Sequence, residues 1–430
     1  MLDIEVFEGG FKETELGPLP EEWEVVRLGE VFDVKQGKQL SSKESKEGKT
    51  LRPFLRTSNV LWNRIDISSI SYMPFSDEEF ETLKLRRGDI LVCEGGDVGR
   101  TSVWEGQLEE CAYQNHLHRL RPKENNIVNY FFSYWMEYAI CLRGLYVNSA
   151  NRTTIPNLSA QRLKSFLIPL PPLKEQKAIA GILSTVQSAI EKTEKVINAL
   201  KNLKKSMMKH LFTYGPVAEE EAEKVELKET EIGLIPKHWE VVRLGEVGNY
   251  INGYAFKPSD WSKTGKPIIR IQNLNNPLAS FNYYNGELDH KYLVKKGDIL
   301  ISWSASLGVY LWNGEDAWLN QHIFKVELTN QKVLKDYFYF ALLYYFTSQA
   351  FTNLHGSTMK HIVKSKFLNI SIPLPPLKEQ QKIAQILQSI DQRIEKEEKY
   401  KNALQNLFKS LLHNLMTGKI RVRVKSHGED

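Results

Sequence analysis

The nine residues Ile168-Pro-Leu-Pro-Pro-Leu-Lys-Glu-Gln176 recur without change as Ile372-Pro-Leu-Pro-Pro-Leu-Lys-Glu-Gln380, and each copy precedes a long helical pattern. The start of each half is repeated too, because Trp23-Glu-Val-Val-Arg-Leu-Gly-Glu-Val31 returns at residues 239–247. Matching residues lie 216 positions apart at this motif and 204 at the proline-rich one, so length changes fall inside the repeated unit. This period far exceeds the roughly 20 to 50 residues of solenoid repeats, which indicates a duplicated domain.

The residues after each proline pair follow the alternating steps of four and three that are typical of a coiled-coil seam. Pro172 and Pro376 are well placed near the first helical turn, where no backbone N–H is needed. The predicted seam consists of Ile179, Leu183, Val186, Ile190, Ile197 and Leu200 in the first helix, and of Ile383, Leu387, Ile390, Ile394, Leu404 and Leu411 in the second.

Four polar residues interrupt this seam: Thr193, Lys204, Glu397 and Lys401. They could set the register of the pairing, or the neighbouring Tyr400 and Leu407 could carry the apolar stripe instead. Each helix could also fold back on its own domain. The narrow seam and the outer faces rich in Lys and Glu favour pairing between helices.

The composition is that of a globular protein, with 42% hydrophobic and 25% charged residues, and 430 residues exceed what one core usually supports. The formal net charge of +5 is only a mild bias toward polyanions. Cys93, Cys111 and Cys141 lack Cys-x-x-Cys spacing, so we expect free thiols rather than disulfides or a structural zinc site. No run approaches the roughly 18 apolar residues of a membrane span, so we expect a soluble, cytoplasmic protein.

These signals divide the chain into six parts: a first globular domain (1–167), a first spacer helix (168–215), a linker (216–237), a second globular domain (238–371), a second spacer helix (372–418) and a basic C-terminal tail (419–430). Short β-rich runs such as Asp89-Ile-Leu-Val92 predict that both domains mix helix and strand. Aromatic stretches at 130–136 and 337–343 fall at matching places, which favours core packing over a base-stacking platform.

In combination and order, the duplicated motifs resemble those of DNA-specificity subunits of type I restriction-modification systems. They are the Trp-Glu-Val-Val-Arg-Leu-Gly-Glu frame, the Gly-Asp-Ile-Leu strand, the Asn- and Gln-rich segments ending in His116 and His322, and the proline-rich repeat. The resemblance covers nearly the whole chain, although each motif alone would be weak. It implies an α+β fold with two mixed α/β target recognition domains in tandem, separated by two long helices that form an antiparallel coiled coil.

The resemblance also implies partners. Each domain would read one half of a bipartite, asymmetric site in double-stranded DNA. Two methyltransferase subunits would transfer a methyl group from S-adenosylmethionine to adenine, and motor-nuclease restriction subunits would use ATP and magnesium to translocate and cut DNA. This chain would hold no cofactor and no metal of its own.

Antiparallel pairing of two equal helices would give the molecule a pseudo-twofold axis, with the helices setting the distance between two half-sites on opposite strands. Because the interiors of the two halves differ, the target should not be a palindrome.

Candidate DNA contacts fall into two groups. Residues that differ between the copies and suit base reading are Arg56, Asn59, Arg64, Arg100, Lys257, Arg270, Gln272 and Asn273. Residues in matching segments, which suit phosphate contact or a shared structural role, are Asn115, His116, Arg152, Thr153, His322, Ser357, Thr358 and Lys360. The alternatives are that hydroxyls cap local turns, that amides and imidazoles fix loops, and that single charged residues are solvated surface groups.

The sequence contains no recognised catalytic signature. A phosphate-binding Walker loop fails because Lys43 stands where its first glycine belongs. The Pro-Pro pairs lack the flanking residues of amino-methyltransferases, and His116 and His118 lack a recognised metal-ligand spacing. Two alternatives to a DNA-reading subunit stay open: a coiled-coil adaptor that binds only proteins, and an enzyme with an unrecognised site.

Overall fold

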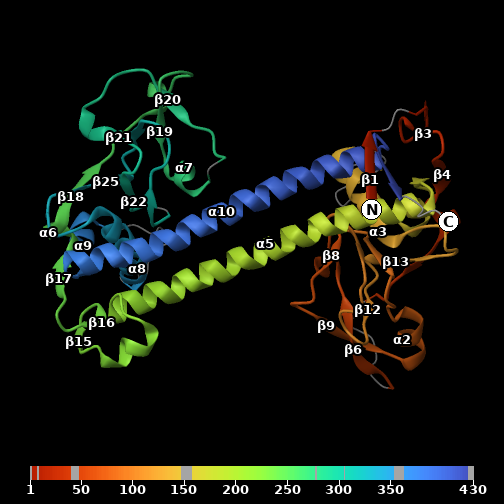
Figure 1. The fold of residues 1–430 in the computed structure, drawn as a ribbon, viewed down its shortest axis with the longest axis horizontal. Helices are drawn as coiled ribbons and strands as arrows, with labels where there is room; N and C mark the ends of the chain where they lie inside the picture. The colour runs from red at the N-terminus through yellow and green to blue at the C-terminus, as the bar shows by residue number, and fades with distance from the viewer. Residues whose placement is uncertain are drawn as a thin grey trace, which may run out of the picture. The chain divides into compact units, whose positions relative to one another are not determined.

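A computed structural model describes residues 2–6, 9–39, 48–146, 157–276, 278–304, 306–352 and 363–424. The chain divides into two compact units. Unit 1 comprises Met1–Glu194 and Lys399–Asp430, and unit 2 comprises Lys195–Glu398. Each unit therefore contains one globular domain together with part of each long helix (Figure 1).

The domain of unit 1 is built on an antiparallel sheet with the strand order β11-β10-β13-β5. These strands are β5 (Phe32–Gln36), β10 (Ile90–Cys93), β11 (Thr101–Val103) and β13 (Leu117–Pro122). The other strands pair as β6 (Thr50–Leu55) with β9 (Ser71–Phe75) and β12 (Ala112–Tyr113), β4 (Glu24–Arg27) with β14 (Leu167–Leu170), β2 (Phe11–Lys12) with β3 (Leu19–Pro20), β7 (Val60–Leu61) with β8 (Arg64–Ile65), and β1 (Leu2–Val6) with β27 (Ile420–Val424). The short helices are α1 (Leu28–Val31), η1 (Thr57–Asn59), α2 (Asp77–Leu83), α3 (Asn129–Glu137), η2 (Tyr138–Leu142) and α4 (Ala160–Lys164).

The domain of unit 2 repeats this sheet in the order β23-β22-β25-β18, which confirms the duplication. These strands are β18 (Gly248–Asn252), β22 (Ile299–Ser302), β23 (Gly308–Leu311) and β25 (Ile323–Leu328). The others are β15 (Leu227–Thr230) with β16 (Gly233–Pro236), β17 (Glu240–Arg243) with β26 (Ser371–Leu374), and a second sheet of β20 (Asn282–Tyr284), β19 (Lys266–Ile269), β24 (Ala317–Leu319) and β21 (Leu293–Val294). The short helices are η3 (Glu219–Lys224), α6 (Leu244–Val247), η4 (Pro258–Asp260), α7 (Ile271–Asn275), η5 (His290–Tyr292) and α9 (Lys364–Leu368), and a longer one is α8 (Lys335–Thr352).

The two long helices are α5 (Leu173–Tyr214) and α10 (Leu377–Met416), as the heptad pattern predicts. Their pairing is antiparallel within each unit. In unit 1 the first turns of α5, at Ile179 and Leu183, share a core with Leu412 and Leu415 near the end of α10. In unit 2 the reverse holds, because Leu211 and Phe212 near the end of α5 share a core with Ile383 and Leu387.

Every member of the predicted seam is buried or half-buried. The alternative stripe is wrong, because Tyr400 is 53% exposed and Leu407 47% exposed. The polar residues stay at the seam and are paired there. Lys401 Nζ lies 3.5 Å from Glu194 Oε1 in unit 1, and Lys204 Nζ lies 2.6 Å from Asp391 Oδ1 in unit 2.

The aromatic helices form the domain cores, as their matching places predict. Phe131, Phe132 and Trp135 of α3 are buried in unit 1, and Tyr337 and Phe338 of α8 are buried in unit 2. The ring of Tyr134 also meets Phe408 of α10 edge to face, with centroids 5.9 Å apart. The domain of unit 1 therefore packs against both long helices.

The two repeated motifs meet in each unit. The indole Nε1 of Trp23 donates to Glu175 Oε2 at 3.1 Å, and that of Trp239 donates to Glu379 Oε2 at 2.8 Å. Neither tryptophan has exposed surface, so each hydrogen bond satisfies an N–H that folding removes from water. The frame at the start of a domain is thereby joined to the start of its helix.

Gln176 strengthens this junction with its side-chain amide. Its Nε2 donates to the carbonyl oxygens of Pro171 at 2.8 Å and Asn126 at 3.0 Å. Its Oε1 accepts from the backbone N–H of Val128 at 2.8 Å. Gln380 makes the three equivalent bonds to its own domain at 2.7–2.8 Å, and both glutamines are fully buried.

The first part of the predicted basic tail forms a strand, β27, which no local sequence pattern indicates. It pairs antiparallel with β1, with Ile4 opposite Val422. Arg421 of this strand is 8% exposed and reaches the junction, where its Nη2 donates to Glu175 Oε2 at 2.8 Å. In unit 2 the matching Glu379 instead contacts His238 Nε2, at 2.8 Å.

Cys93 and Cys111 are buried, and burial raises the pKa of their thiols to about 11 and about 12. Both are therefore protonated near neutral pH and poorly nucleophilic. Within the described ranges no helix is long and apolar enough to cross a membrane.

We expect Gln176→Ala to lower the free energy of unfolding by about 2 to 4 kcal/mol, because it leaves buried backbone groups without partners. Urea denaturation of the full chain measures this change. Lys177→Ala, at the exposed next position, is the matched control. A difference between the two variants below about 0.5 kcal/mol would contradict the structural role of the amide.

Candidate nucleic-acid interface

One edge of the central sheet gathers several of the predicted DNA contacts of unit 1. The loop after β10 begins at Glu94, whose backbone N–H donates to His116 O at 2.9 Å. The loop 94–100 therefore lies beside the turn that carries Asn115 and His116. His116 is exposed and Asn115 is half-buried.

Arg100 closes this loop. Its Nη1 lies 3.2 Å from Asp97 Oδ2, and its Nη2 donates to Thr57 O at 3.0 Å. Its side chain is 17% exposed, so most of the guanidinium is covered by the protein. Thr57 belongs to η1, so this hydrogen bond places the η1 turn, with Arg56 and Asn59, at the same edge of the sheet.

Asn59 and Asn273 hold equivalent turns. Asn59 Oδ1 accepts from Arg56 N at 2.8 Å, and Asn273 Oδ1 accepts from Arg270 N at 3.1 Å. Each Nδ2 donates to two further backbone carbonyls at 2.9–3.3 Å. The asparagines are 3% and 7% exposed, so their amides are occupied by the fold.

The prediction that Arg56, Asn59, Arg270 and Asn273 differ between the copies is wrong. Arg56 matches Arg270 and Asn59 matches Asn273, each 214 positions apart, in an Arg-x-x-Asn turn that both domains share. The geometry favours a structural role for the asparagines. The Arg270 guanidinium lies 5.3 Å from the Trp261 ring, and DNA contact by either arginine stays a prediction.

The remaining predicted contacts are placed as follows. Arg64 on β8 lies 3.9 Å from Glu194 of α5, so the structure does not bring it to the edge with Arg100 and His116. Lys257 is exposed just before η4, and Gln272 is exposed on α7. The predicted contacts that lie outside the described residues are Arg152, Thr153, Ser357, Thr358 and Lys360.

The same sheet edge exists in unit 2. His322 is exposed, its carbonyl accepts from Trp303 N at 3.4 Å, and its ring centroid lies 5.5 Å from that of Trp303. His322 Nε2 also lies 3.0 Å from Gln321 Nε2. His116 and His322 thus occupy equivalent exposed turns.

Four residues at these edges were missed from the sequence. Gln36 Nε2 donates to Glu94 Oε2 at 2.8 Å in unit 1, and Trp303 Nε1 donates to Asn252 Oδ1 at 3.2 Å in unit 2. Both pairs occupy the same two positions of the duplicated sheet. A signal was present, because the repeated strand that begins Gly-Asp-Ile-Leu is followed by Glu94 in one copy and Trp303 in the other.

The residues beneath these pairs also differ. His118 is fully buried, its Nε2 lies 2.7 Å from Leu158 O, and Glu94 Oε2 is 4.0 Å away. Phe324 takes the place of His118 in unit 2 and stacks on Trp303 with centroids 5.6 Å apart. Among the described residues, no three His, Cys, Asp or Glu side chains are grouped so that they could hold a metal ion.

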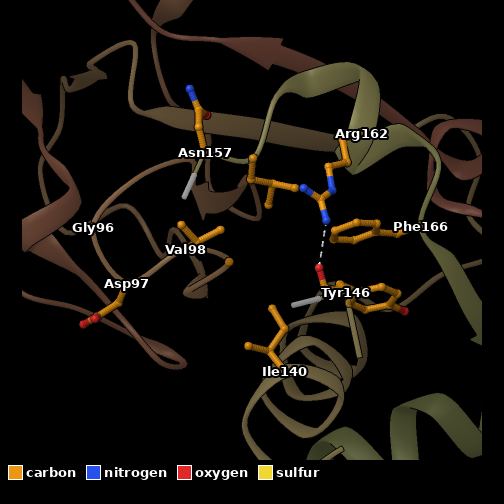
Figure 2. A pocket seen from close by; sticks show the side chains of 10 residues that line it. Gly96, Asp97, Val98, Ile140, Tyr146, Asn157, Arg162 and Phe166 are labelled. Atoms are coloured by element: carbon orange, nitrogen blue, oxygen red, sulfur yellow. Dashed lines mark hydrogen bonds between the residues drawn. The ribbon is translucent and has the colours of Figure 1, made fainter. Parts of the chain in front are cut away.

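A hollow of about 280 Å³ lies beside the loop of unit 1. Figure 2 shows Val98, Ile140 and Phe166 around it, with Arg162 donating to the backbone carbonyl of Tyr146, a bond of 3.1 Å. The Tyr146 ring stacks on Phe166 at 3.9 Å. Because this lining is mostly apolar, the hollow does not resemble a phosphate site.

Comparisons with known proteins agree with this arrangement. The sequence pattern of the type I restriction modification DNA specificity domain matches residues 20–202 and again 236–406. The putative type I restriction enzyme MjaX specificity subunit of Methanocaldococcus jannaschii is 33% identical over 97% of this chain and 98% of its own length. The MjaVIII specificity subunit of the same organism is 31% identical over 97% of both chains. The crystal structure of a type I restriction-modification S subunit from M. genitalium shares the fold, with a TM-score of 0.57, 19% identity, and coverage of 91% of this chain and 96% of that one.

We expect Asn273→Ala to lower the free energy of unfolding by about 2 kcal/mol, because three buried hydrogen bonds are lost. Gln272→Ala changes the exposed neighbour and should stay within about 0.5 kcal/mol of the wild type. Thermal or urea denaturation separates the two variants. Equal stabilities would show that the Asn273 amide does not hold the turn.

Proposed function

Because this chain belongs to the family of type I restriction-modification DNA specificity subunits, we propose that each of its two globular domains reads one half of a bipartite, asymmetric DNA site. The chain is a recognition subunit and not the catalyst of its complex. The observation that carries the proposal is the duplicated sheet, whose frame is the same in both units while the side chains at one edge differ.

The geometry supports two separate specificities. Shared residues such as the Trp23 and Trp239 indoles and the two helix-anchoring glutamines build the frame. The edges carry different side chains: the exposed Gln36 is bonded to Glu94 in unit 1, and the exposed Asn252 is bonded to the Trp303 indole in unit 2. A shared frame with different edges suits two unlike half-sites, so the target is not a palindrome. The exposed His116 and His322, at equivalent turns, are suited to contacts that both half-sites share.

The proposed partners supply the chemistry. Methyltransferase subunits would bind S-adenosylmethionine and methylate adenine within the site, and restriction subunits would use ATP and magnesium to move and cut DNA. The complex would act on DNA in the cytoplasm. This chain determines which DNA sequence the complex selects.

Two methyltransferase subunits are suggested by a repeated apolar surface on the long helices. Val196 and Leu203, one heptad apart on α5, are 42% and 47% exposed. Their counterparts 204 positions later, Tyr400 and Leu407 on α10, are 53% and 47% exposed. Exposed apolar pairs at equivalent places suit two copies of the same partner.

Co-expression with a methyltransferase subunit from the same source, followed by genome-wide mapping of methylated adenine, tests the function. We expect a split, asymmetric motif with a fixed spacer. Exchanging residues 238–371 for those of a related subunit should change one half of the motif only. A stable complex that methylates no motif would instead favour an adaptor that binds only proteins, and turnover by the isolated chain would favour an enzyme.

We expect Leu203→Glu and Leu407→Glu each to weaken the binding of one methyltransferase subunit by at least about tenfold, because a buried leucine contributes roughly 2 kcal/mol. The mass of the complex at limiting concentration measures the loss. Asn202→Glu and Asn406→Glu add the same charge at exposed neighbouring positions and are the controls. Full occupancy in both leucine variants would remove this surface from the interface.

A further inference from the structure

The amide of Gln36 is held in one orientation. Its Nε2 donates to Glu94 Oε2 at 2.8 Å and to Asn115 O at 2.9 Å. A carboxylate and a backbone carbonyl can only accept, so the chemistry of the partners fixes which end of the amide is the NH2 group. Both hydrogens are used, and the described residues give the Oε1 atom no donor. Gln36 is exposed, so it presents a hydrogen-bond acceptor to solvent.

Asn252, at the equivalent position of unit 2, is held in the opposite sense. Its Oδ1 accepts from the Trp303 indole Nε1 at 3.2 Å. An indole N–H can only donate, so the oxygen of Asn252 must face the tryptophan. Its Nδ2 is left without an acceptor among the described residues, and the side chain is exposed. Asn252 therefore presents a hydrogen-bond donor.

Glu94 and Trp303, the partners of the two amides, are themselves held by further contacts. Glu94 is 6% exposed, and its backbone is bonded to His116 O and to Leu158 N, each at 2.9 Å. Trp303 lies between His322 and Phe324, with ring centroids at 5.5 and 5.6 Å. These contacts restrict the side chains that orient Gln36 and Asn252.

The backbone beside each amide is equally constrained. A Cβ at Gly37 would lie 2.3 Å from Gln114 O, and one at Gly253 would lie 2.1 Å from Asn320 O. Only glycine allows the strand end to approach the neighbouring turn this closely. The close approach brings Gln36 and Asn252 next to the exposed turns of His116 and His322.

A lone acceptor and a lone donor select different bases. In the major groove the exocyclic position of adenine or cytosine is an amino donor, whereas that of guanine or thymine is a carbonyl acceptor. A buried carboxylate without a close cation is costly, and among the described residues Glu94 is paired only with the imidazole of His118, at 4.0 Å. The cost is explained if the carboxylate serves to orient Gln36.

Resting on the proposed function, we propose that Gln36 selects an amino-bearing base, adenine or cytosine, at one position of the half-site read by unit 1. Asn252 selects a carbonyl-bearing base, guanine or thymine, at one position of the half-site read by unit 2. Glu94 and Trp303 are positioning residues that set these opposite preferences.

The test uses the complex of the full chain with its methyltransferase subunit. Asn252→Asp keeps an oxygen for the Trp303 indole and replaces the outward NH2 group by an acceptor. We expect one base of the second half-site to change from guanine or thymine to adenine or cytosine in methylation mapping, while the first half-site stays the same. Glu94→Gln gives Gln36 a partner that can also donate, so the Gln36 amide is no longer fixed in one orientation. The preference for adenine or cytosine over guanine or thymine at one base of the first half-site should fall by about tenfold, the worth of one hydrogen bond.

The unchanged half-site reports that each variant is folded. A motif that is identical at every base in Asn252→Asp, or altered in both halves, would overturn the inference and leave the proposed function standing. A wild-type complex without a split motif would instead overturn the proposed function.

Duplex binding supplies a second measurement that needs no methylation by a variant. Each adenine of the first half-site is replaced by purine, and each cytosine by 2-pyrimidinone, which removes the amino group. At one position the wild-type complex should lose about tenfold in affinity, and the Gln36→Ala complex should lose nothing further at that position. An equal loss in both complexes, or a loss at no position, would show that Gln36 does not read an amino group.

Discussion

The buried amides of Gln176 and Gln380 fasten each long helix to the domain before it, and the rest of the architecture depends on this fastening. Each amide bonds two backbone groups of its own domain and a proline carbonyl just before the helix, beside a glutamate that receives the indole N–H of Trp23 or Trp239. The orientation of a domain on its helix is thereby defined by groups that cannot shift without losing buried hydrogen bonds. This explains why the helix start and the domain start are the most faithfully repeated stretches of the chain.

Much of the fold follows from local sequence signals. The steps of four and three predict α5 and α10, and the Gly-Asp-Ile-Leu repeats predict β10 and β22, because these patterns depend on neighbouring residues. The exposure of Tyr400 and Leu407 was open from the pattern alone, since one-residue shifts of a heptad leave similar apolar content. The pairing of β27 with β1 was missed, because a strand contact across almost the whole chain has no local signal.

The candidate site was less accessible to sequence reasoning. Residue type identified exposed polar groups such as His116 and His322, but it could not show that the amides of Asn59 and Asn273 are consumed by their turns. The orientation of an amide depends on partners distant in sequence, as with Gln36 and Glu94. Only the switch from Glu94 to Trp303 after a repeated strand marked this position in the sequence.

The division of the chain has a consequence for its synthesis. Unit 2 is the continuous stretch Lys195–Glu398, whereas unit 1 needs Lys399–Asp430 as well as its own first residues. Phe408, Leu412 and Leu415 belong to the core of unit 1, so part of that core leaves the ribosome after all of unit 2. The domain that is translated first is thus completed second. The apolar surface that α10 later covers stays exposed to solvent while unit 2 is made. A ribosome that stops after Glu398 would release an intact unit 2 joined to an unfinished unit 1.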